Sequence, residues 1–504
     1  LLVYNLSVKD LTQNPDLRKR EVIDDYFGDW KWREGLSELM IPIIGNLYRN
    51  GIQIYIYGQS LVNNSSIEIL KAHRFVRQVE GNELSELETY PILVAITSLD
   101  LPDCEIDIGE LAVRCPFFDK LKDNPQDKVN EYVLSELNSI VNTSSNRPKA
   151  PKEIVLYGFG RIGRLLTRLL VETTGPGNYF RLRAIVVRKG AGDDLLKRAS
   201  LLRRDSVHGK FRGTIRVDVD NNLLIINGNP VKVIYANSPD DVNYKNENIK
   251  DPIVIDNTGV WRDMDGLNKH IHCGADKVIL TAPGKGNIKN IVFGVNDDIF
   301  DAKDKVISAA SCTTNAIVPV LKVVNDKYKI VTGHIETVHS YTNDQNLIDN
   351  YHKGDRRGRS AALNMVITST GAVNAVAKAI PELEGKLTGN AIRVPTPNVS
   401  LALLVLELNE EVTKESLNDY LKDSAFRSKY RQILGFVNSS EIVSTDFYSS
   451  QFASVIDAQA TIVNGKHVTL YCWYDNEYGY SQQVLNLTKK IASIDLPLLP
   501  LSIQ

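Results

Sequence analysis

Cysteine is scarce in this sequence, and the few cysteines form no metal-binding or disulfide pattern. Only five occur in 504 residues, at Cys104, Cys115, Cys273, Cys312 and Cys472. An odd number without paired spacing argues against a disulfide framework and against a zinc cluster. We therefore expect no metal site, and we expect the protein to work in a reducing compartment, the cytoplasm.

The sequence also lacks a membrane-length apolar run, an export signal and a strong net charge. Apolar stretches such as residues 40–44 are far shorter than the roughly 18 residues that a membrane helix needs, and the first ten residues carry no basic n-region. The 59 basic and 61 acidic residues leave a formal net charge of −2. No overall field recruits nucleic acid or an anionic membrane, so a small molecule or a protein is the expected partner.

A polar segment divides the sequence into two regions with different patterns. Residues 142–152, NTSSNRPKAPK, contain two prolines, which is typical of a linker. Before the linker, residues 11–40 and 67–86 carry apolar side chains at three- and four-residue spacing, which favours amphipathic helices. We predict a mainly helical N-terminal domain over residues 1–145.

After the linker, short β-branched runs alternate with helical or loop stretches. The runs are residues 154–157, 184–187, 253–257, 277–280 and 306–309. This alternation is typical of a parallel sheet, so it predicts an α/β fold with a doubly wound sheet.

The first of these runs leads directly into a glycine fingerprint, YGFGRIGRLLTRLL. Gly158, Gly160 and Gly163 form G-x-G-x-x-G between a predicted strand and a predicted helix. Such glycines permit a tight turn and a close approach to a pyrophosphate at the positive end of the helix. Because strand and helix flank the motif, we predict a Rossmann-type dinucleotide-binding domain over residues 152–310 rather than an ordinary glycine-rich turn.

The cofactor preference is indicated by the absence of an acidic residue after the fingerprint. An NAD site usually offers Asp or Glu to the ribose hydroxyls roughly 20 residues after the fingerprint, but residues 173–192 contain no acid. The second predicted strand ends instead in Arg188 and Lys189, which could pair with a 2′-phosphate. The sequence favours NADP, and NAD bound through other contacts is the alternative.

The segment SAASCTTNA, residues 308–316, holds a candidate nucleophile. If a strand ends near Ala309 and a helix begins near Thr313, the Cys312 thiol lies at a helix N-terminus, where the dipole favours thiolate. Oxidation of an aldehyde through a thiolate also needs a base, and His339 follows a strand-like segment. Spacing alone does not bring the two residues together, and both could be ordinary core side chains.

A set of motifs in the second region resembles one enzyme family. The motifs are YGFGRIGR, RRDSVHGKF, DNTGV, SAASCTTNAIVPVLK, TVHSYTNDQ, RRGRSAALNMVITSTGA, AIRVPTPNVSL and WYDNEYGYS. In this order they resemble phosphorylating glyceraldehyde-3-phosphate dehydrogenase, from about Lys152 to Ile491.

The resemblance implies a mechanism. Cys312 would attack the aldehyde, and His339 would act as base and donate to the oxyanion. The Cys312 backbone N–H would also donate to the oxyanion. Hydride would pass to NAD or NADP, and inorganic phosphate would release 1,3-bisphosphoglycerate from a thioester. The reaction is reversible, and it would belong to glycolysis or gluconeogenesis.

The resemblance also implies two anion sites. Thr342 and Arg393 would hold the substrate phosphate. Ser311, Thr313, Thr370 and Gly371 would line the site of inorganic phosphate, with Arg357 completing the pair of sites.

The cofactor residues follow in the same way. Gly158, Gly160, Arg161, Ile162, Gly163, Arg188, Thr258, Gly259 and Asn476 would contact the dinucleotide. Asn476 would fix the nicotinamide carboxamide. The family commonly has an aspartate where Arg188 and Lys189 stand, which puts NAD selectivity in doubt.

The expected architecture continues with an α+β catalytic domain over residues 311–474 and a last helix near residues 482–491 that packs on the dinucleotide domain. The loop YHKGDRRGRS resembles an intersubunit loop, which implies a homotetramer. The roughly 150 residues before the fingerprint are unusual for the family. Two other functions stay open: an erythrose-4-phosphate dehydrogenase that hydrolyses its thioester, and a scaffold paralogue without catalysis.

Overall fold

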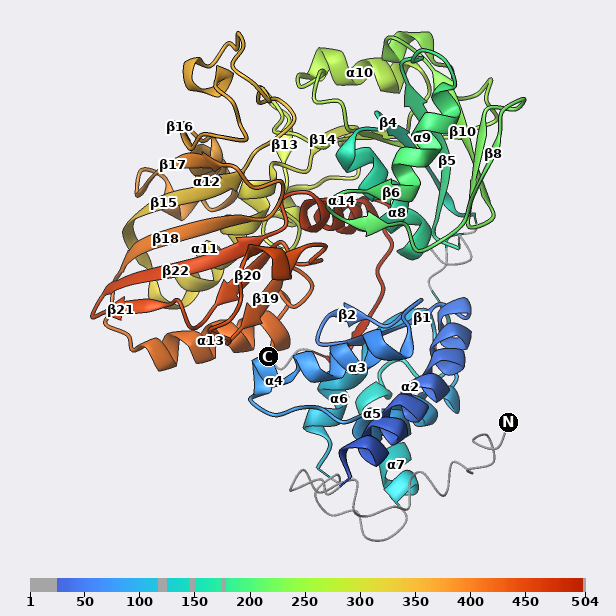
Figure 1. Ribbon diagram of the computed structural model, residues 1–504, viewed down its shortest axis with the longest axis vertical. Coiled ribbons are helices and arrows are strands. Elements are labelled where there is room, and N and C mark those ends of the chain that lie inside the picture. The colour runs from blue at the N-terminus through green and yellow to red at the C-terminus, as the bar shows by residue number, and fades with distance from the viewer. Residues whose placement is uncertain (1–24, 117–124, 146–147, 149, 174–177, 502–504) are drawn as a thin grey trace. The chain divides into compact units, whose positions relative to one another are not determined.

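The computed structural model describes residues 25–116, 125–145, 148, 150–173 and 178–501 (Figure 1). The chain divides into two compact units. One contains residues 1–147 together with residues 495–504, and the other contains residues 148–494. The beginning of the predicted helical stretch 11–40 lies outside the described residues, which start at Asp25.

The first unit is mostly helical, as predicted, and it also contains a four-stranded sheet that the sequence analysis did not predict. Its helices are α2 (Tyr26–Arg49), α3 (Ser66–Phe75), α4 (Arg77–Glu80), α5 (Glu86–Thr97), α6 (Ile108–Arg114) and α7 (Pro125–Leu137). Its strands, in the order β2-β1-β3-β23, are β2 (Gln59–Ser60), β1 (Ile52–Ile56), β3 (Cys104–Asp107) and β23 (Leu498–Leu499).

Local sequence explains the helices of this unit. Leu36, Met40, Ile44 and Leu47 of α2 recur every three or four residues, and all four are buried. Helices α3 and α5 begin with capping boxes, Ser65 with Glu68 and Ser85 with Glu88. Each box satisfies backbone N–H groups that the first helical turn leaves without partners.

The strand β23 comes from the far C-terminal end of the chain. It runs parallel to β3 with Leu499 opposite Ile106, and the Glu105 N–H donates to the Pro497 carbonyl at 2.9 Å. The Leu499 side chain is completely buried. The sequence predicted an N-terminal domain of residues 1–145 only, and the structure adds this C-terminal segment to the unit.

The second unit begins with a nine-stranded sheet. Its strands, from one edge to the other, are β13 (Lys289–Asn290), β14 (Val306–Ser308), β12 (Lys277–Leu280), β11 (Ile253–Asp256), β4 (Lys152–Tyr157), β5 (Phe180–Val187), β10 (Asn229–Tyr235), β9 (Leu223–Ile226) and β8 (Ile215–Asp218). In chain order the six main parallel strands lie 3-2-1-4-5-6, which is the doubly wound Rossmann arrangement. The predicted sheet is confirmed, and its strand order reverses between β4 and β11.

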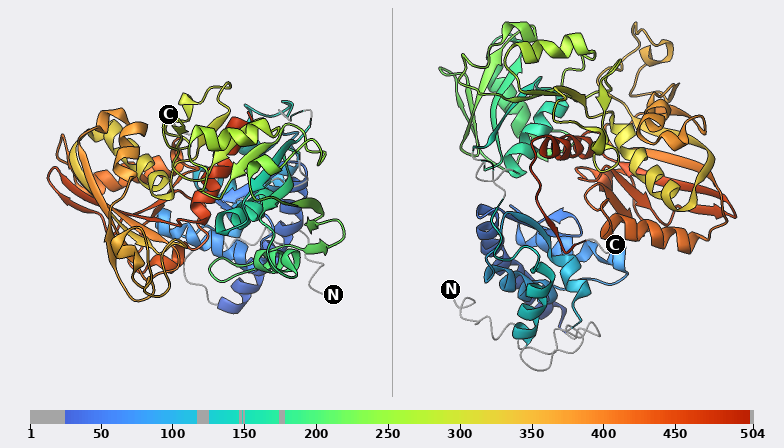
Figure 2. Two further views of the ribbon diagram at one scale, coloured as in Figure 1. Left: turned by 90° about the horizontal axis from the view of Figure 1, so that it is seen from above. Right: turned by 180° about the vertical axis from the view of Figure 1, so that it is seen from behind.

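Four helices pack on or follow this sheet. They are α8 (Arg161–Thr173), α9 (Asp194–Arg203), α10 (Met264–His272) and the last helix, α14 (Tyr478–Ile491). Helix α14 begins four residues earlier than the predicted 482 and packs against both α8 and α11. Figures 1 and 2 show α14 between the nine-stranded sheet and the second sheet of this unit.

The second sheet of this unit has eight strands. These are β16 (Val366–Thr368), β17 (Leu387–Val394), β15 (Ile330–Ser340), β18 (Ser400–Leu408), β22 (His467–Tyr474), β20 (Ser454–Asp457) and β19 (Leu434–Val437), with β21 (Ile462–Asn464) beside β22. Helices α11 (Cys312–Tyr328), α12 (Ala372–Ala379) and α13 (Lys414–Arg427) complete it. Helix α11 contacts strands β15, β18, β20 and β22, so its N-terminus is fixed beside the strand that carries His339.

Within the described ranges, no helix combines the length and apolar character needed to cross a bilayer. The same residues contain no group of three or more His, Cys, Asp or Glu side chains that could hold a metal ion. All five cysteines are free thiols.

Candidate active site

The turn before Cys312 is tightly held. Ala310 has a positive φ of 55°, which is unfavourable for a residue with a Cβ. Its N–H donates to Ser308 Oγ at 3.0 Å, and its carbonyl accepts from the Tyr480 hydroxyl of α14 at 3.1 Å. These contacts maintain the strained turn that directs the chain from β14 into α11.

Cys312 is the first residue of α11. Ser311 is the N-cap, and its Oγ accepts the Thr314 N–H at 3.1 Å. The thiol therefore lies at the positive end of a 17-residue helix, as the sequence predicted.

His339 is the second-to-last residue of β15, and it faces the N-terminus of α11. Its Nε2 is 3.6 Å from Cys312 Sγ, so the structure brings together the two residues that spacing could not join. The buried Tyr474 hydroxyl lies 3.2 Å from Thr313 Oγ1 and 2.7 Å from Thr337 Oγ1. Tyr474 thereby links α11 to β15 and fixes the distance between thiol and imidazole.

The proton position on His339 depends on Arg393, which lies opposite it on β17. His339 Nδ1 is 2.7 Å from the Ser340 carbonyl, to which only a protonated nitrogen donates. Arg393 Nη1 is 2.8 Å from the same Nδ1, a contact in which only an unprotonated nitrogen accepts. The two contacts exclude one another, so the position of Arg393 selects the tautomer.

Burial and Arg393 also set the charges of the pair. Burial raises the pKa of the Cys312 thiol, while the positive charge of Arg393 acts in the opposite direction. Burial and then the Arg393 charge lower the pKa of His339 to about 3. Neutral thiol and neutral imidazole are therefore favoured at pH 7, and an anion on Arg393 would ease protonation of His339.

An acidic residue joins the predicted anion-binding groups. Thr342 Oγ1 donates to Asp344 Oδ1, and Arg357 Nη1 donates to Asp344 Oδ2 at 3.0 Å. Arg393 Nη1 lies 3.5 Å from Thr342 Oγ1, while its Nε is buried and has no hydrogen-bond partner among the residues that the structure describes. Since a buried guanidinium N–H requires an acceptor, this orphaned donor fits an anion site.

The other predicted phosphate residues fall into two groups. Ser311 and Thr313 lie beside Cys312, and Thr313 Oγ1 is 4.0 Å from its sulfur. Thr370 and Gly371 lie at the start of α12, where the Ala372 N–H donates to Thr370 Oγ1 at 3.2 Å. Helix α12 packs on α11, although no hydrogen bond between described residues joins Thr370 to the Cys312 pair.

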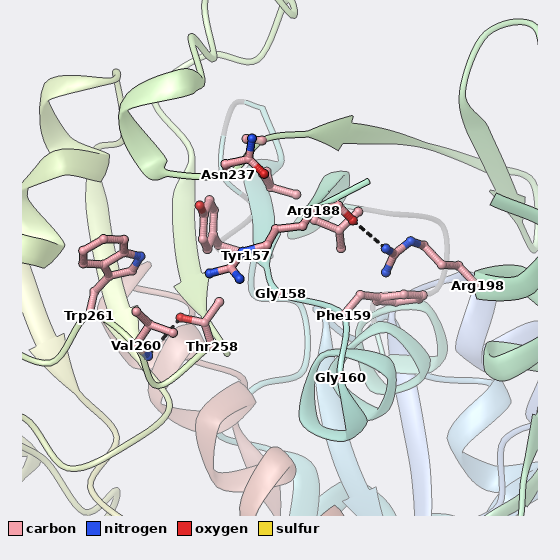
Figure 3. Close-up of a pocket in the computed structure, with 13 residues that line it drawn as sticks. Tyr157, Gly158, Phe159, Gly160, Arg188, Arg198, Asn237, Thr258, Val260 and Trp261 are labelled. Carbon is pink, nitrogen blue, oxygen red and sulfur yellow. Dashed lines mark hydrogen bonds between the residues drawn. The ribbon is translucent and has the colours of Figure 1, made fainter. Parts of the chain in front are cut away.

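Gly158 and Gly160 of the glycine fingerprint line a cavity of about 400 Å³ at the carboxyl ends of β4, β5 and β11 (Figure 3). Gly158 has a φ of +102°, and a Cβ on Gly163 would lie 2.4 Å from the Gly158 carbonyl oxygen. A Cβ on Gly160 would meet nothing within 4 Å, so this position leaves the backbone open to a ligand. The three glycines fit a pyrophosphate in the manner of a dinucleotide fingerprint.

Of the remaining predicted cofactor residues, some line this cavity and others do not. Arg188 and Thr258 line the cavity, and Gly259 continues the Thr258 turn with a φ of +62°. Ile162 lies in the first turn of α8. The Asn476 Oδ1 accepts from Ser400 Oγ at 3.0 Å.

The Arg161 guanidinium is occupied by protein carboxylates. It donates to Glu477 and to Asp205, and Glu477 also contacts His208 Nε2 at 3.0 Å. This ion-pair cluster joins the start of α8 to the start of α14. Arg161 therefore has its backbone N–H, rather than its side chain, to offer a dinucleotide.

Comparison with known proteins assigns the family. The model "Glyceraldehyde 3-phosphate dehydrogenase, NAD binding domain" matches residues 152–264, and the corresponding "C-terminal domain" matches residues 311–476. Glyceraldehyde-3-phosphate dehydrogenase 1 of Bacillus subtilis is 43% identical over 68% of this chain and 98% of its own length. The chain belongs to the glyceraldehyde-3-phosphate dehydrogenase family.

Relatives of this dehydrogenase differ in how much of the chain they match. The chloroplastic glyceraldehyde-3-phosphate dehydrogenase A of Zea mays is 41% identical over 69% of this chain and 85% of its own length. A "glyceraldehyde-3-phosphate dehydrogenase-like protein" of Pseudomonas aeruginosa is 55% identical over 92% of this chain and 100% of its own length. A match of 92% includes most of the residues before Lys152, so this relative shares the N-terminal extension.

Three residues of the candidate site were not predicted from the sequence. Asp344 and Tyr474 stand inside the quoted motifs TVHSYTNDQ and WYDNEYGYS, so the same motifs could have identified them. Arg198 lines the dinucleotide cavity from α9, ten residues after Arg188, and no motif marks it. Lys189, by contrast, is not among the lining residues, and its Nζ lies 5.6 Å from the centre of the Tyr235 ring.

Proposed function

We propose that this family member is a phosphorylating dehydrogenase that converts glyceraldehyde 3-phosphate, inorganic phosphate and NAD(P) reversibly to 1,3-bisphosphoglycerate and NAD(P)H. The observation that carries the proposal is the 3.6 Å contact between Cys312 Sγ and His339 Nε2, at a helix N-terminus and beside Arg393. A thiol, a base and an anion-binding guanidinium are the groups that oxidation of a phosphorylated aldehyde requires.

The first half of the reaction forms a thioester. His339 Nε2 takes the thiol proton, and the Cys312 thiolate attacks the aldehyde carbon to give a hemithioacetal. The Cys312 N–H and the protonated imidazole donate to the oxyanion as it forms. His339 then removes the hydroxyl proton as hydride leaves the same carbon with two electrons. A bound nicotinamide supplies the hydride acceptor.

The second half transfers the acyl group to phosphate. A phosphate oxygen attacks the thioester carbon, the carbon–sulfur bond breaks, and the Cys312 thiolate leaves. We assign the substrate phosphate to Thr342 and Arg393, and inorganic phosphate to Ser311, Thr313, Thr370 and Gly371, with Arg357 completing the pair of sites. The orphaned Arg393 Nε and the Arg357 guanidinium support this assignment, because guanidinium groups suit phosphate oxygens.

We assign the dinucleotide to Gly158, Gly160, Arg161, Ile162, Gly163, Arg188, Thr258, Gly259 and Asn476, and we favour NADP over NAD. The cavity that contains the fingerprint is lined by Arg188 and Arg198 and by no carboxylate among its lining residues. The ribose hydroxyls of NAD would lack the usual acidic acceptor there, while a 2′-phosphate would meet positive charge.

We further assign dinucleotide binding to residues 152–310 and catalysis to residues 311–474, and propose a homotetramer in a reducing compartment such as the cytoplasm. Large apolar side chains are exposed around the arginine-rich loop at residues 351–360, with Leu347, Tyr351, Leu363 and Met365 between 75% and 91% exposed. Such a patch fits burial against another subunit. The free cysteines are consistent with the compartment.

Steady-state rates with glyceraldehyde 3-phosphate test the proposal, measured with NAD and with NADP, each with and without phosphate. We expect turnover that depends on phosphate and is faster with NADP. Turnover that ignores phosphate, together with a preference for erythrose 4-phosphate, would select the hydrolysing alternative. No turnover with any combination would select the scaffold alternative.

A further inference from the structure

Helix α9, which follows β5, begins with an acid whose side chain is already hydrogen-bonded within the protein. In Rossmann-type sheets the cofactor's adenosine ribose lies beside the loop between this strand and this helix. Asp194, the first residue of α9, is buried, and it accepts from the Gly190 N–H at 3.2 Å and from Arg198 Nε at 2.7 Å. The Tyr235 hydroxyl also bonds to it. Asp194 therefore shapes the loop and is not offered to ribose hydroxyls.

Arg198 is held in place by these contacts. Besides the bond to Asp194 one turn earlier, its Nη2 donates to the Arg188 carbonyl at 2.7 Å. Its Nη1 makes no hydrogen bond within the part of the chain that the structure describes. A guanidinium fixed through two of its three nitrogens loses little further freedom when the third binds an anion.

Arg188 contributes from the other side of the same cavity. Figure 3 shows its side chain reaching across the pocket toward Tyr157, while Arg198 lies beside the Arg188 carbonyl. Among the described residues that line the cavity beside Arg188 there is no carboxylate. The cavity thus combines one guanidinium held by two hydrogen bonds with a second guanidinium.

We infer that Arg198 is a specificity-determining residue, which together with Arg188 binds the 2′-phosphate of NADP. The inference rests on the proposed dehydrogenase function and names the groups that select its cofactor. Arg198 supplies a directed N–H, and Arg188 supplies charge that a 2′-phosphate offsets and a 2′-hydroxyl does not.

Equilibrium binding of adenosine 2′,5′-bisphosphate and of 5′-AMP to the full chain, measured by calorimetry, tests the inference without turnover. We expect the wild type to bind the bisphosphate more tightly. Arg198→Gln should weaken bisphosphate binding roughly 10- to 100-fold, as for loss of a hydrogen bond to a charged group, and should leave 5′-AMP binding nearly unchanged.

Two further variants complete the test. Lys197→Gln removes a neighbouring positive charge that donates to the Ala191 carbonyl and does not line the cavity, so it should leave both affinities nearly unchanged. Arg198→Lys keeps the positive charge but loses the planar set of guanidinium N–H donors. It should give an intermediate loss of bisphosphate affinity even if the Gln variant folds poorly.

The outcomes separate this inference from the proposed reaction. Equal weakening of both ligands by Arg198→Gln, or no weakening, would overturn the role of Arg198. Equal binding of both ligands by the wild type would overturn the NADP preference as well. The expected binding pattern in a chain without dehydrogenase turnover would refute the proposed reaction and leave the inference standing.

Discussion

The two compact units of this chain are stabilised and used differently. The unit of residues 148–494 contains the glycine fingerprint, the Cys312–His339 pair and every residue that the sequence predicted for the site. The N-terminal unit contains none of these, and its small sheet includes β23 from the other end of the chain. All candidate catalytic residues therefore lie in one unit, while the sheet of the other unit includes a strand from the far end of the chain.

The chain therefore connects the units at two places, residues 147–148 and 494–495. The second connection follows α14, the helix whose Tyr480 holds the turn before Cys312. Removing only the N-terminal residues would leave the completely buried Leu499 without its β3 partner.

The largest expected effect concerns the candidate nucleophile in the unit of residues 148–494. Cys312→Ser should abolish nearly all dehydrogenase turnover while the fold and cofactor binding persist, because a serine hydroxyl has no comparable anionic form. Turnover and cofactor titration check this. The control is Cys273→Ser, a partly exposed thiol that donates to the Pro239 carbonyl and should keep its activity. Near-normal turnover of the Cys312 variant would refute the mechanism.

The next effect concerns the base. His339→Asn should slow hydride transfer by roughly 10²- to 10⁴-fold, the usual contribution of a positioned base. His334→Asn, on the same strand but bonded to Thr388, should not slow it. Single-turnover rates against pH make the measurement, and a variant with the wild-type pH profile would remove His339 from this role.

The third effect is on the N-terminal unit. Leu499→Ala should destabilise that unit by about 2 to 5 kcal/mol, the cost of truncating a buried leucine. Hydrogen exchange should speed up in β3 and remain unchanged in α11. Leu501→Ala, at a position 57% exposed, is the matched control. Equal loss of protection in both units would show that their stabilities are not separate.

An effect of similar size, spread over several pH units, is expected in the pH dependence of stability. The pKa of His339 is about 3 in the folded protein and ordinarily 6.5, so on acidification the unfolded chain binds this proton first. The stability of the neutral form is therefore complete above pH 6.5 and is lost as the pH falls toward 3. Denaturant unfolding at a series of pH values measures this. Relative to His339→Asn, the free energy of unfolding of the wild type should fall by up to about 1.4 kcal/mol per pH unit in this range. If the free energies of unfolding of the wild type and of His339→Asn changed equally with pH, the lowered pKa of His339 would be contradicted.

The smallest effect should follow removal of the whole N-terminal unit. A chain of residues 148–494 should keep its turnover within a small factor, because every candidate catalytic residue lies inside it. A chain of residues 148–504 should be equally active but less soluble, since Leu499 loses its cover. Loss of all activity with fold and assembly intact would show that the extension contributes to the active site.

The dehydrogenase unit could be predicted from the sequence in most of its strands and in the chemistry of its site. Buried parallel strands are continuous β-branched runs, such as residues 277–280, which match β12. The contact between Cys312 and His339 could be expected from motifs and not from spacing, because it depends on how α11 packs on β15.

Other features were harder to predict, although β1 alternates apolar residues in IQIYI with the burial pattern of a strand. Strands β1 and β3 are short and lie between stronger helical patterns, and β23 has only two residues, so no periodicity marks it. Arg198 enters the cavity through its bonds to Asp194 and Arg188, which only the folded loop creates. The same loop turns Lys189 toward Tyr235.

The proposed reaction requires Cys312 to form a thioester that only phosphate discharges efficiently. The most direct measurement incubates the full chain with glyceraldehyde 3-phosphate and oxidised cofactor without phosphate, and then maps the acyl group by mass spectrometry. We predict an acyl adduct on Cys312 that disappears rapidly when phosphate is added, with formation of an acyl phosphate. An adduct on another residue, or turnover without any adduct and without dependence on phosphate, would contradict the account.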